Sequence, residues 1–152
     1  MKLAEALLLR ADMQKKLASL KQRLGENVKV QEGDLPSEDP QALLNESSRV
    51  ISELYALITQ IHRTNAIAIM PNGQTMLMAL VARDGLGERH RLLQSAIDNA
   101  KTEGDRYSYR EIKWQKVVDI QSLQQQADDI AVKLRQLNID IQAANWQIEL
   151  VE

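Results

Sequence analysis

Two arginines stand at positions where the helical pattern of this 152-residue sequence would ordinarily place apolar side chains. Arg10 and Arg83 each belong to a row of apolar residues spaced by three and four, which is the spacing of one helix face. A guanidinium group without a partner in a packed interior is costly, and its fork of N–H donors suits a carboxylate or a phosphate. The two arginines are therefore the first candidates for chemistry.

Three more polar residues are expected at the same height in a bundle of helices. Counting ~1.5 Å per residue from the end that holds the N-terminus places Asn65 near Arg10 and Arg83, with Asn145 on the last helix. Asp84 is the nearest acidic partner in sequence for Arg83. Three interpretations of these five residues remain open: a hydrogen-bonded layer that fixes helix register, a pocket for a small anionic ligand, or arginines that extend outward to solvent.

The two histidines do not form a recognisable metal site. Di-iron bundles place a glutamate three residues before a histidine, and neither His62 nor His90 has one. The sequence has no glycine-rich phosphate loop, no Gly-x-Ser-x-Gly elbow, no His-Glu-x-x-His motif and no cysteine. We therefore expect no catalytic residue, no metal and no cofactor, and we interpret His90 as a hydrogen-bonded core residue.

Basic and aromatic residues are mixed between residues 106 and 116. These residues are Arg106, Tyr107, Tyr109, Arg110, Lys113, Trp114 and Lys116. Such a mixture can contact single-stranded nucleic acid, but Asp105 and Glu111 dilute its charge and the formal net charge of the chain is −2. We expect Ile112 and Trp114 to cover one end of the helices, and we do not expect binding to nucleic acid.

Four helical stretches must position these residues. The apolar spacing predicts helices over Leu3 to Leu24, Pro40 to Ile69, Met76 to about Lys101, and Asp119 to Val151. Gly25 is expected to end the first helix, and Asp39 with Pro40 to begin the second. Gly85 and Gly87 fall inside the third helix, which we expect to continue through them although each costs ~1 kcal/mol relative to alanine.

Residues 28–32 and 110–116 alternate apolar and polar side chains, which is typical of short strands. In an up-down-up-down bundle, the two connections that contain them emerge at the same end. The sequence therefore predicts a mainly α fold in a single domain, residues 1–152. Four long antiparallel helices would form the bundle, and an antiparallel pair of strands would close one end.

Composition limits the location of the protein and the ligands that it could bind. Charged residues among the first ten positions lead us to expect no signal peptide, and no run approaches the roughly 18 consecutive apolar residues of a membrane span. We therefore expect a soluble, cytoplasmic protein that does not bind membranes. Its long amphipathic helices and lack of a catalytic motif favour a non-enzymatic protein that acts by oligomerisation, as a homo-oligomer or with a partner.

Short segments spread over nearly the whole chain together resemble the septicolysin-like family of small bacterial proteins, whose function is otherwise unknown. The segments are residues 1–7, 30–33, 38–40, 63–66, 82–84, 89–90, 105–107, 111–113 and 145–146. The resemblance implies a stand-alone bacterial protein of about this length, and the family name implies a membrane-active cytolysin. A small anionic-ligand-binding protein or enzyme that uses Arg10, Asn65 and Arg83 is the other alternative.

Overall fold

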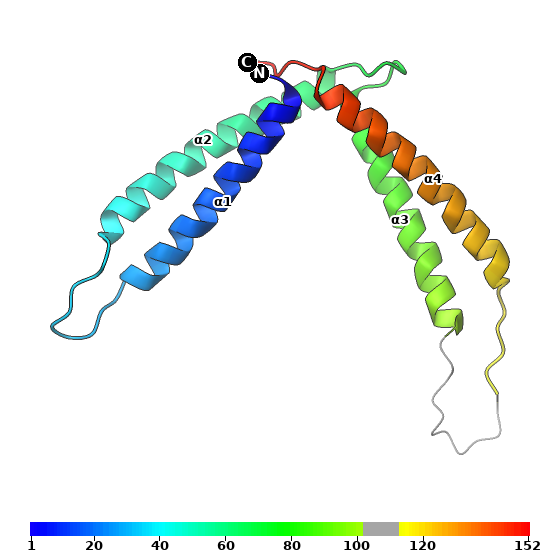
Figure 1. Ribbon diagram of the computed structural model, residues 1–152, viewed down its shortest axis with the longest axis horizontal. Helices are drawn as coiled ribbons and strands as arrows, with labels where there is room; N and C mark the ends of the chain where they lie inside the picture. Colours follow the sequence, from blue (N-terminus) through cyan, green and yellow to red (C-terminus); the bar gives the residue numbers. More distant parts are fainter. Residues whose placement is uncertain (102–112) are drawn as a thin grey trace. The chain divides into compact units, whose positions relative to one another are not determined.

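The computed structural model describes residues 1–101 and 113–152 and contains four long helices (Figure 1). They are α1 (Leu3–Asn27), α2 (Pro40–Ile67), α3 (Met76–Lys101) and α4 (Ile120–Asn145). The chain divides into two compact units, and each is described by itself: unit 1 is Met1–Met76 with Ala143–Glu152, and unit 2 is Leu77–Gln142. The mainly helical fold is confirmed, while the single domain over residues 1–152 stays a prediction.

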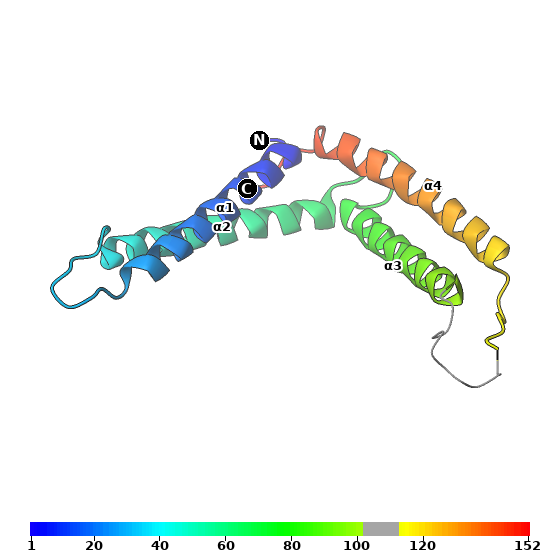
Figure 2. The same cartoon turned by 60° about the horizontal axis from the view of Figure 1, so that its bottom comes forward.

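Unit 1 is built on the antiparallel pair of α1 and α2, which lie side by side in both views (Figures 1 and 2). Its buried seam follows the spacing of three and four that the sequence predicts. The seam residues buried most deeply are Leu3, Ala6 and Leu20 on α1, and Leu43, Val50, Leu54, Leu57 and Ile61 on α2. Leu20, Leu43 and Val50 form one apolar cluster, which Leu17 and Leu24 extend. Burial of this seam is what holds the two helices together.

Unit 2 contains α3 and most of α4, which also run antiparallel and side by side (Figures 1 and 2). Ala79 and Ile97 on α3, and Ala127 and Ile141 on α4, are at most 1% exposed. All four belong to the predicted seams, so the sequence pattern identified the buried face of each helix.

The start of α2 and the turn before α3 form as predicted. The carboxylate of Asp39 accepts hydrogen bonds from the backbone N–H groups of Gln41 and Ala42 at 3.1 and 3.3 Å. In the Pro71–Gly73 turn, the backbone N–H of Gly73 donates to the carbonyl of Met70 at 2.9 Å, and Gly73 has φ +84°. A positive φ is the reason that this turn uses glycine.

Two helix ends differ from the prediction. Gly25 lies inside α1, which continues to Asn27. The side chain of Asn27 donates to the carbonyl of Arg23 at 2.8 Å and accepts from the backbone N–H of Glu38 at 2.9 Å, so a contact from outside the helix determines its end. At the other end of the chain, α4 stops at Asn145 and not at Val151, because the residues that follow pair with the N-terminal segment.

The predicted pair of strands is wrong for the described residues. Residues 28–32 and 113–116 are irregular, and residues 110–112 lie outside the described part of the chain. The backbone N–H of Asp34 donates to the carbonyl of Gln31 at 3.0 Å, which makes a turn where the strand was expected. Val28 and Val30 are 59% and 47% exposed, so their alternation does not mark a buried face. Trp114 is 87% exposed and does not serve as the expected cover.

The third helix is continuous through Gly85 and Gly87, as predicted. A Cβ atom added at Gly85 would meet no atom within 4 Å. Gly85→Ala should therefore raise the free energy of unfolding by about 1 kcal/mol, because alanine loses less backbone freedom on folding. Urea denaturation followed by circular dichroism measures the change. Gly73→Ala is the control and should destabilise the protein through its positive φ, whereas a loss of stability in Gly85→Ala would contradict the prediction.

Candidate functional site

Three of the five candidate residues lie in unit 1. Arg10 is partly buried on α1, and its Nε is shielded from solvent without a hydrogen-bond partner among the described residues. Asn65 is partly buried near the end of α2, and Asn145, the last residue of α4, is 4% exposed. Each of these polar residues is therefore at least partly withdrawn from water.

The other two candidates, Arg83 and Asp84, lie in unit 2 and pair with each other. The Nε and Nη2 atoms of Arg83 donate to Oδ1 of Asp84 at 3.1 and 3.0 Å. The Arg83 side chain is 36% exposed and that of Asp84 71%, and an ion pair so exposed contributes little to stability. The structure thus brings Arg83 and Asp84 together. The polar layer that would join them to Arg10, Asn65 and Asn145 of unit 1 stays a prediction.

A groove of about 550 Å³ runs along unit 2 between α3 and α4. His90 lines it from α3, and Ala131, Leu134, Arg135, Asn138, Ile139 and Gln142 line it from α4. His90 is therefore a partly buried groove residue and not the hydrogen-bonded core residue expected, since nothing in the described part of the chain bonds its ring. A second groove of about 420 Å³ shares Leu134 and Asn138 and contains Arg83, Asp84 and Gly87.

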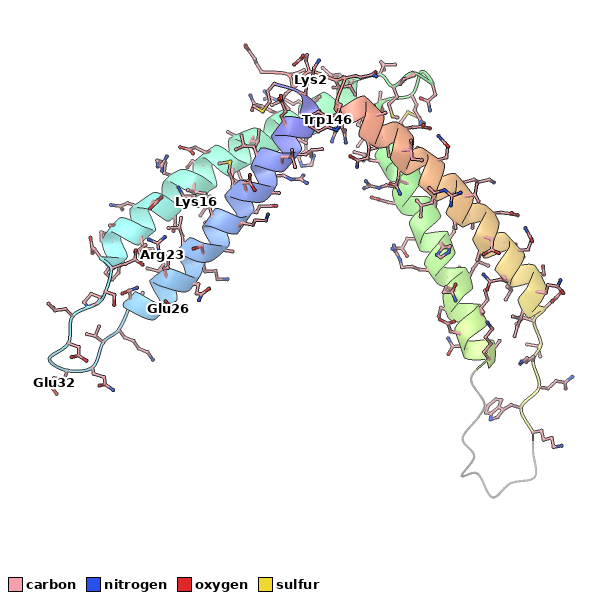
Figure 3. All side chains as sticks on the ribbon, viewed as in Figure 1. Lys2, Lys16, Arg23, Glu26, Glu32 and Trp146 are labelled. Carbon is pink, nitrogen blue, oxygen red and sulfur yellow. The ribbon has the colours of Figure 1, made fainter. Side chains whose placement is uncertain are left out.

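One long edge of the α1/α2 pair is charged. Lys16 Nζ lies 2.9 Å from Glu46 Oε1, and the guanidinium of Arg23 binds both carboxylate oxygens of Glu38, with Nε 2.8 Å from Oε2. Figure 3 labels Lys16 and Arg23 along α1. Their hydrogen bonds lower the pKa of Glu46 and the pKa of Glu38 below the usual value. We call this surface the charged edge of unit 1.

On the opposite edge of the same pair, α2 carries a row of uncharged residues. Leu44, Ile51 and Tyr55 are 46%, 42% and 62% exposed, and Ser48 is exposed as well. We define the uncharged face of α2 as Leu44, Ser48, Ile51, Ser52, Tyr55, Ile58 and Thr59. A second heptad row, offset by one residue from the buried seam, is the signal in the sequence that could have revealed this face.

Two of the four hydroxyl groups on the uncharged face, those of Ser52 and Thr59, are already bonded within the helix. Ser52 Oγ donates to the carbonyl of Ser48 at 3.1 Å, and Thr59 Oγ1 donates to the carbonyl of Tyr55 at 2.8 Å. Covering these two hydroxyls would therefore leave no donor without a partner. The face thus combines exposed apolar side chains with two hydroxyl groups that do not require water as a partner.

The two terminal segments of the chain meet in unit 1, in a contact that we call the terminal clasp. Lys2 and Glu149 form an antiparallel bridge flanked by two backbone hydrogen bonds of 2.9 Å. Glu149 also forms ion pairs with Lys2 Nζ at 2.5 Å and with the Met1 amine at 3.3 Å, and the hydrogen bond from Lys2 is the main cause of its lowered pKa. Fully buried Thr64 completes the clasp, because its Oγ1 accepts from the backbone N–H of Val151 at 3.0 Å.

Two features of the described residues bear on function. No three histidine, aspartate or glutamate side chains among residues 1–101 and 113–152 are grouped so that they could hold a metal ion. Over the same part of the chain, none of the helices has the length and apolar character needed to cross a membrane.

Comparison with known proteins gives a family and a structural relative. Residues 10–150 match the model described as "Family of unknown function (DUF6847)". The chain is also similar to a functionally unknown conserved protein from Corynebacterium diphtheriae, whose crystal structure superimposes with a TM-score of 0.92 at 38% identity. That similarity covers 99% of each chain. No curated protein matches the sequence.

The expected septicolysin-like family is wrong. The matched family model and the similar crystal structure are both described as functionally unknown, and neither description mentions a septicolysin. The segments that carried the resemblance are two to seven residues long. Segments so short occur in many helical sequences, because apolar spacing and capping residues recur wherever a helix must form. The expectation of a membrane-active function rested only on that family name, so it no longer has a basis.

Proposed function

Because the chain belongs to the family of unknown function DUF6847, we propose its role from its surfaces: a non-enzymatic helical protein that acts by association, first with a second copy of itself. The observation that carries this proposal is the exposure of large apolar side chains on both helix pairs. Tyr55 in unit 1, and Val81, Leu92 and Val132 in unit 2, are between 54% and 72% exposed. A pair of helices can bury one seam, and further apolar faces need further helices to cover them.

Two sequence predictions belong to this proposal. The four helices would complete the antiparallel bundle predicted from their seams, and the protein would work in the cytoplasm. Both fit a chain whose net charge is −2 and whose exposed surface combines ion pairs with apolar rows. The first test of the proposal is therefore the mass of the protein in solution.

Light scattering on the full chain, from low to high micromolar concentration, measures this association. We expect a molar mass that is a multiple of the 17.2 kDa of one chain and that falls on dilution. Mass action predicts this fall, because dissociation is favoured at low protein concentration. A mass of 17.2 kDa at every concentration would overturn the proposal.

A second candidate function is the binding of a small anion near Arg10. It is favoured by the Nε atom of Arg10, which is shielded from solvent and has no partner among the described residues. A carboxylate or phosphate would supply the missing acceptor. Inorganic phosphate should then raise the thermal unfolding midpoint of the wild type and leave that of Arg10→Met unchanged, with sodium chloride at equal ionic strength as the control. An equal response in both proteins would remove this candidate.

A further inference from the structure

We propose that the uncharged face of α2 docks on the same face of a second copy, with the two α2 helices antiparallel. The inference rests on the proposed function, because it names the surface and the partner through which the protein associates. It is carried by four features of the described residues: the distribution of charge, the symmetry of the apolar row, the bonding of the Ser52 and Thr59 hydroxyl groups, and the area available.

Charge separates the two edges of the α1/α2 pair. The charged residues of α2 between positions 44 and 59 are Glu46, Arg49 and Glu53. Glu46 pairs with Lys16 across the helices, and Arg49 pairs with Glu53 at 3.0 Å. These contacts keep all three residues away from the uncharged face. Two copies can therefore approach through that face without opposing like charges and without burying an ion.

The apolar row is symmetric about Ile51, as a twofold contact requires. Leu44 and Ile58 each lie seven residues from Ile51, on either side of it. When two α2 helices cross antiparallel at Ile51, that residue meets its own copy, and Leu44 of one chain meets Ile58 of the other. Ser48 lies three residues before Ile51 and Tyr55 four residues after it, so the two come within one residue of facing each other, and a small side chain leaves space beside an aromatic ring. The row is thus complementary to itself in size as well as in polarity.

Small residues on α1 extend the docking surface. Lys16 and Glu46 lie on the charged edge, which is on one side of the buried seam. The residue that directly follows a seam residue in sequence lies on the other side of the seam, at the opposite edge of the pair. On α1 these positions include Ala11 and Ala18, whose methyl groups allow another helix to come close, and also exposed Lys21, ten residues along α1 from Ala11. The hydroxyls of Ser52 and Thr59 are satisfied within α2, so contact costs no hydrogen bond there.

The edge of the helix pair is large enough for a stable dimer. The 25 residues of α1 extend ~37 Å, and two adjacent helices are ~20 Å wide, so the edge offers roughly 750 Å². A standard interface buries about 800 Å² on each partner. Two α1/α2 pairs joined through this edge would form a four-helix arrangement with a second buried seam.

Single cysteines test the contact directly, because the chain has none of its own. Ile51→Cys should give a covalent dimer on mild oxidation or with a short bis-maleimide, since the two copies of residue 51 meet at the twofold axis. Ser19→Cys, at an exposed position on α1 away from the uncharged face, is the control and should remain a single chain on a non-reducing gel. Equal cross-linking of both variants would contradict the proposed face.

A charge placed at the contact gives an independent measurement. Ile51→Glu brings two carboxylates together at the axis and should raise the dimer dissociation constant about a hundredfold. Ser19→Glu, at the exposed position on α1 that also serves as the cross-linking control, should leave this constant unchanged, and circular dichroism checks that both variants are folded.

The outcomes distinguish this inference from the proposed function. A wild type that associates, an Ile51→Cys variant that cross-links and an Ile51→Glu variant that dissociates would support both. Association that persists in Ile51→Glu, without cross-linking of Ile51→Cys, overturns the inference and leaves the proposed function standing. A wild type that is a single chain at every concentration overturns both.

Discussion

Leu20→Ala should lower the free energy of unfolding by about 3 kcal/mol. Leu20 is 1% exposed and lies at the centre of the cluster with Leu43 and Val50, and Leu17 and Leu24 pack against the same group. Truncation removes buried methyl groups and leaves a cavity that two straight helices cannot close without losing their register. Because the α1/α2 pair is held by a single seam, no second core layer compensates for the loss.

Urea denaturation followed by far-ultraviolet circular dichroism measures this change. Leu8→Ala is the matched control, because it makes the same substitution on the same helix at a position 60% exposed. It should alter the free energy of unfolding by less than about 0.5 kcal/mol. Similar losses in the two variants would mean that α1 does not use the predicted seam.

Thr64→Val should lower the free energy of unfolding by about 2 kcal/mol and release the segment after Asn145. Thr64 is fully buried, and its hydroxyl accepts from the backbone N–H of Val151 while it donates to the carbonyl of Gln60 at 2.8 Å. Valine keeps the shape of the side chain but removes the acceptor. The N–H of Val151 is then left without its partner, which is the costly case for a group withdrawn from water.

Amide hydrogen exchange of Val151, together with denaturation, follows this change. Thr59→Val is the matched control, because Thr59 makes the same bond to a carbonyl of its own helix but does not contact the C-terminal segment. Exchange at Val151 should accelerate in Thr64→Val and remain unchanged in Thr59→Val. Unchanged exchange in both variants would show that the clasp does not depend on the hydroxyl.

The helices were predictable because their causes lie within a few residues. The bounds of α3 and the start of α2 at Asp39 follow from spacing and capping, which operate inside one or two turns. Gly25 failed as a helix end because Asn27 binds Glu38 across a loop, and α4 ended early because its last apolar residues pair with the N-terminal segment. Contacts between distant residues have no signature in local periodicity.

The candidate site was predictable only in part, for the same physical reason. Spacing identified Arg10 and Arg83 as polar members of apolar rows, and their partial burial agrees with that interpretation. Proximity in sequence also identified Asp84 as a partner for Arg83, and the two residues pair. No such local rule gives a partner for Arg10, whose Nε is shielded without one among the described residues. Apolar spacing alone does not separate the exposed Leu44 and Ile51 from the buried row of α2, because each directly follows a seam residue.

The terminal clasp has a consequence for the order in which the molecule folds. The contacts of α1 with α2 join segments that follow one another, whereas the Lys2–Glu149 bridge and the Thr64–Val151 bond each close a very long loop. Loop closure costs more entropy as the loop grows, and contacts between distant residues slow folding. We therefore expect α1 and α2 to pair early in folding and residues 143–152 to join them late. The half of the chain that is synthesised first is then the last to form all of its native contacts.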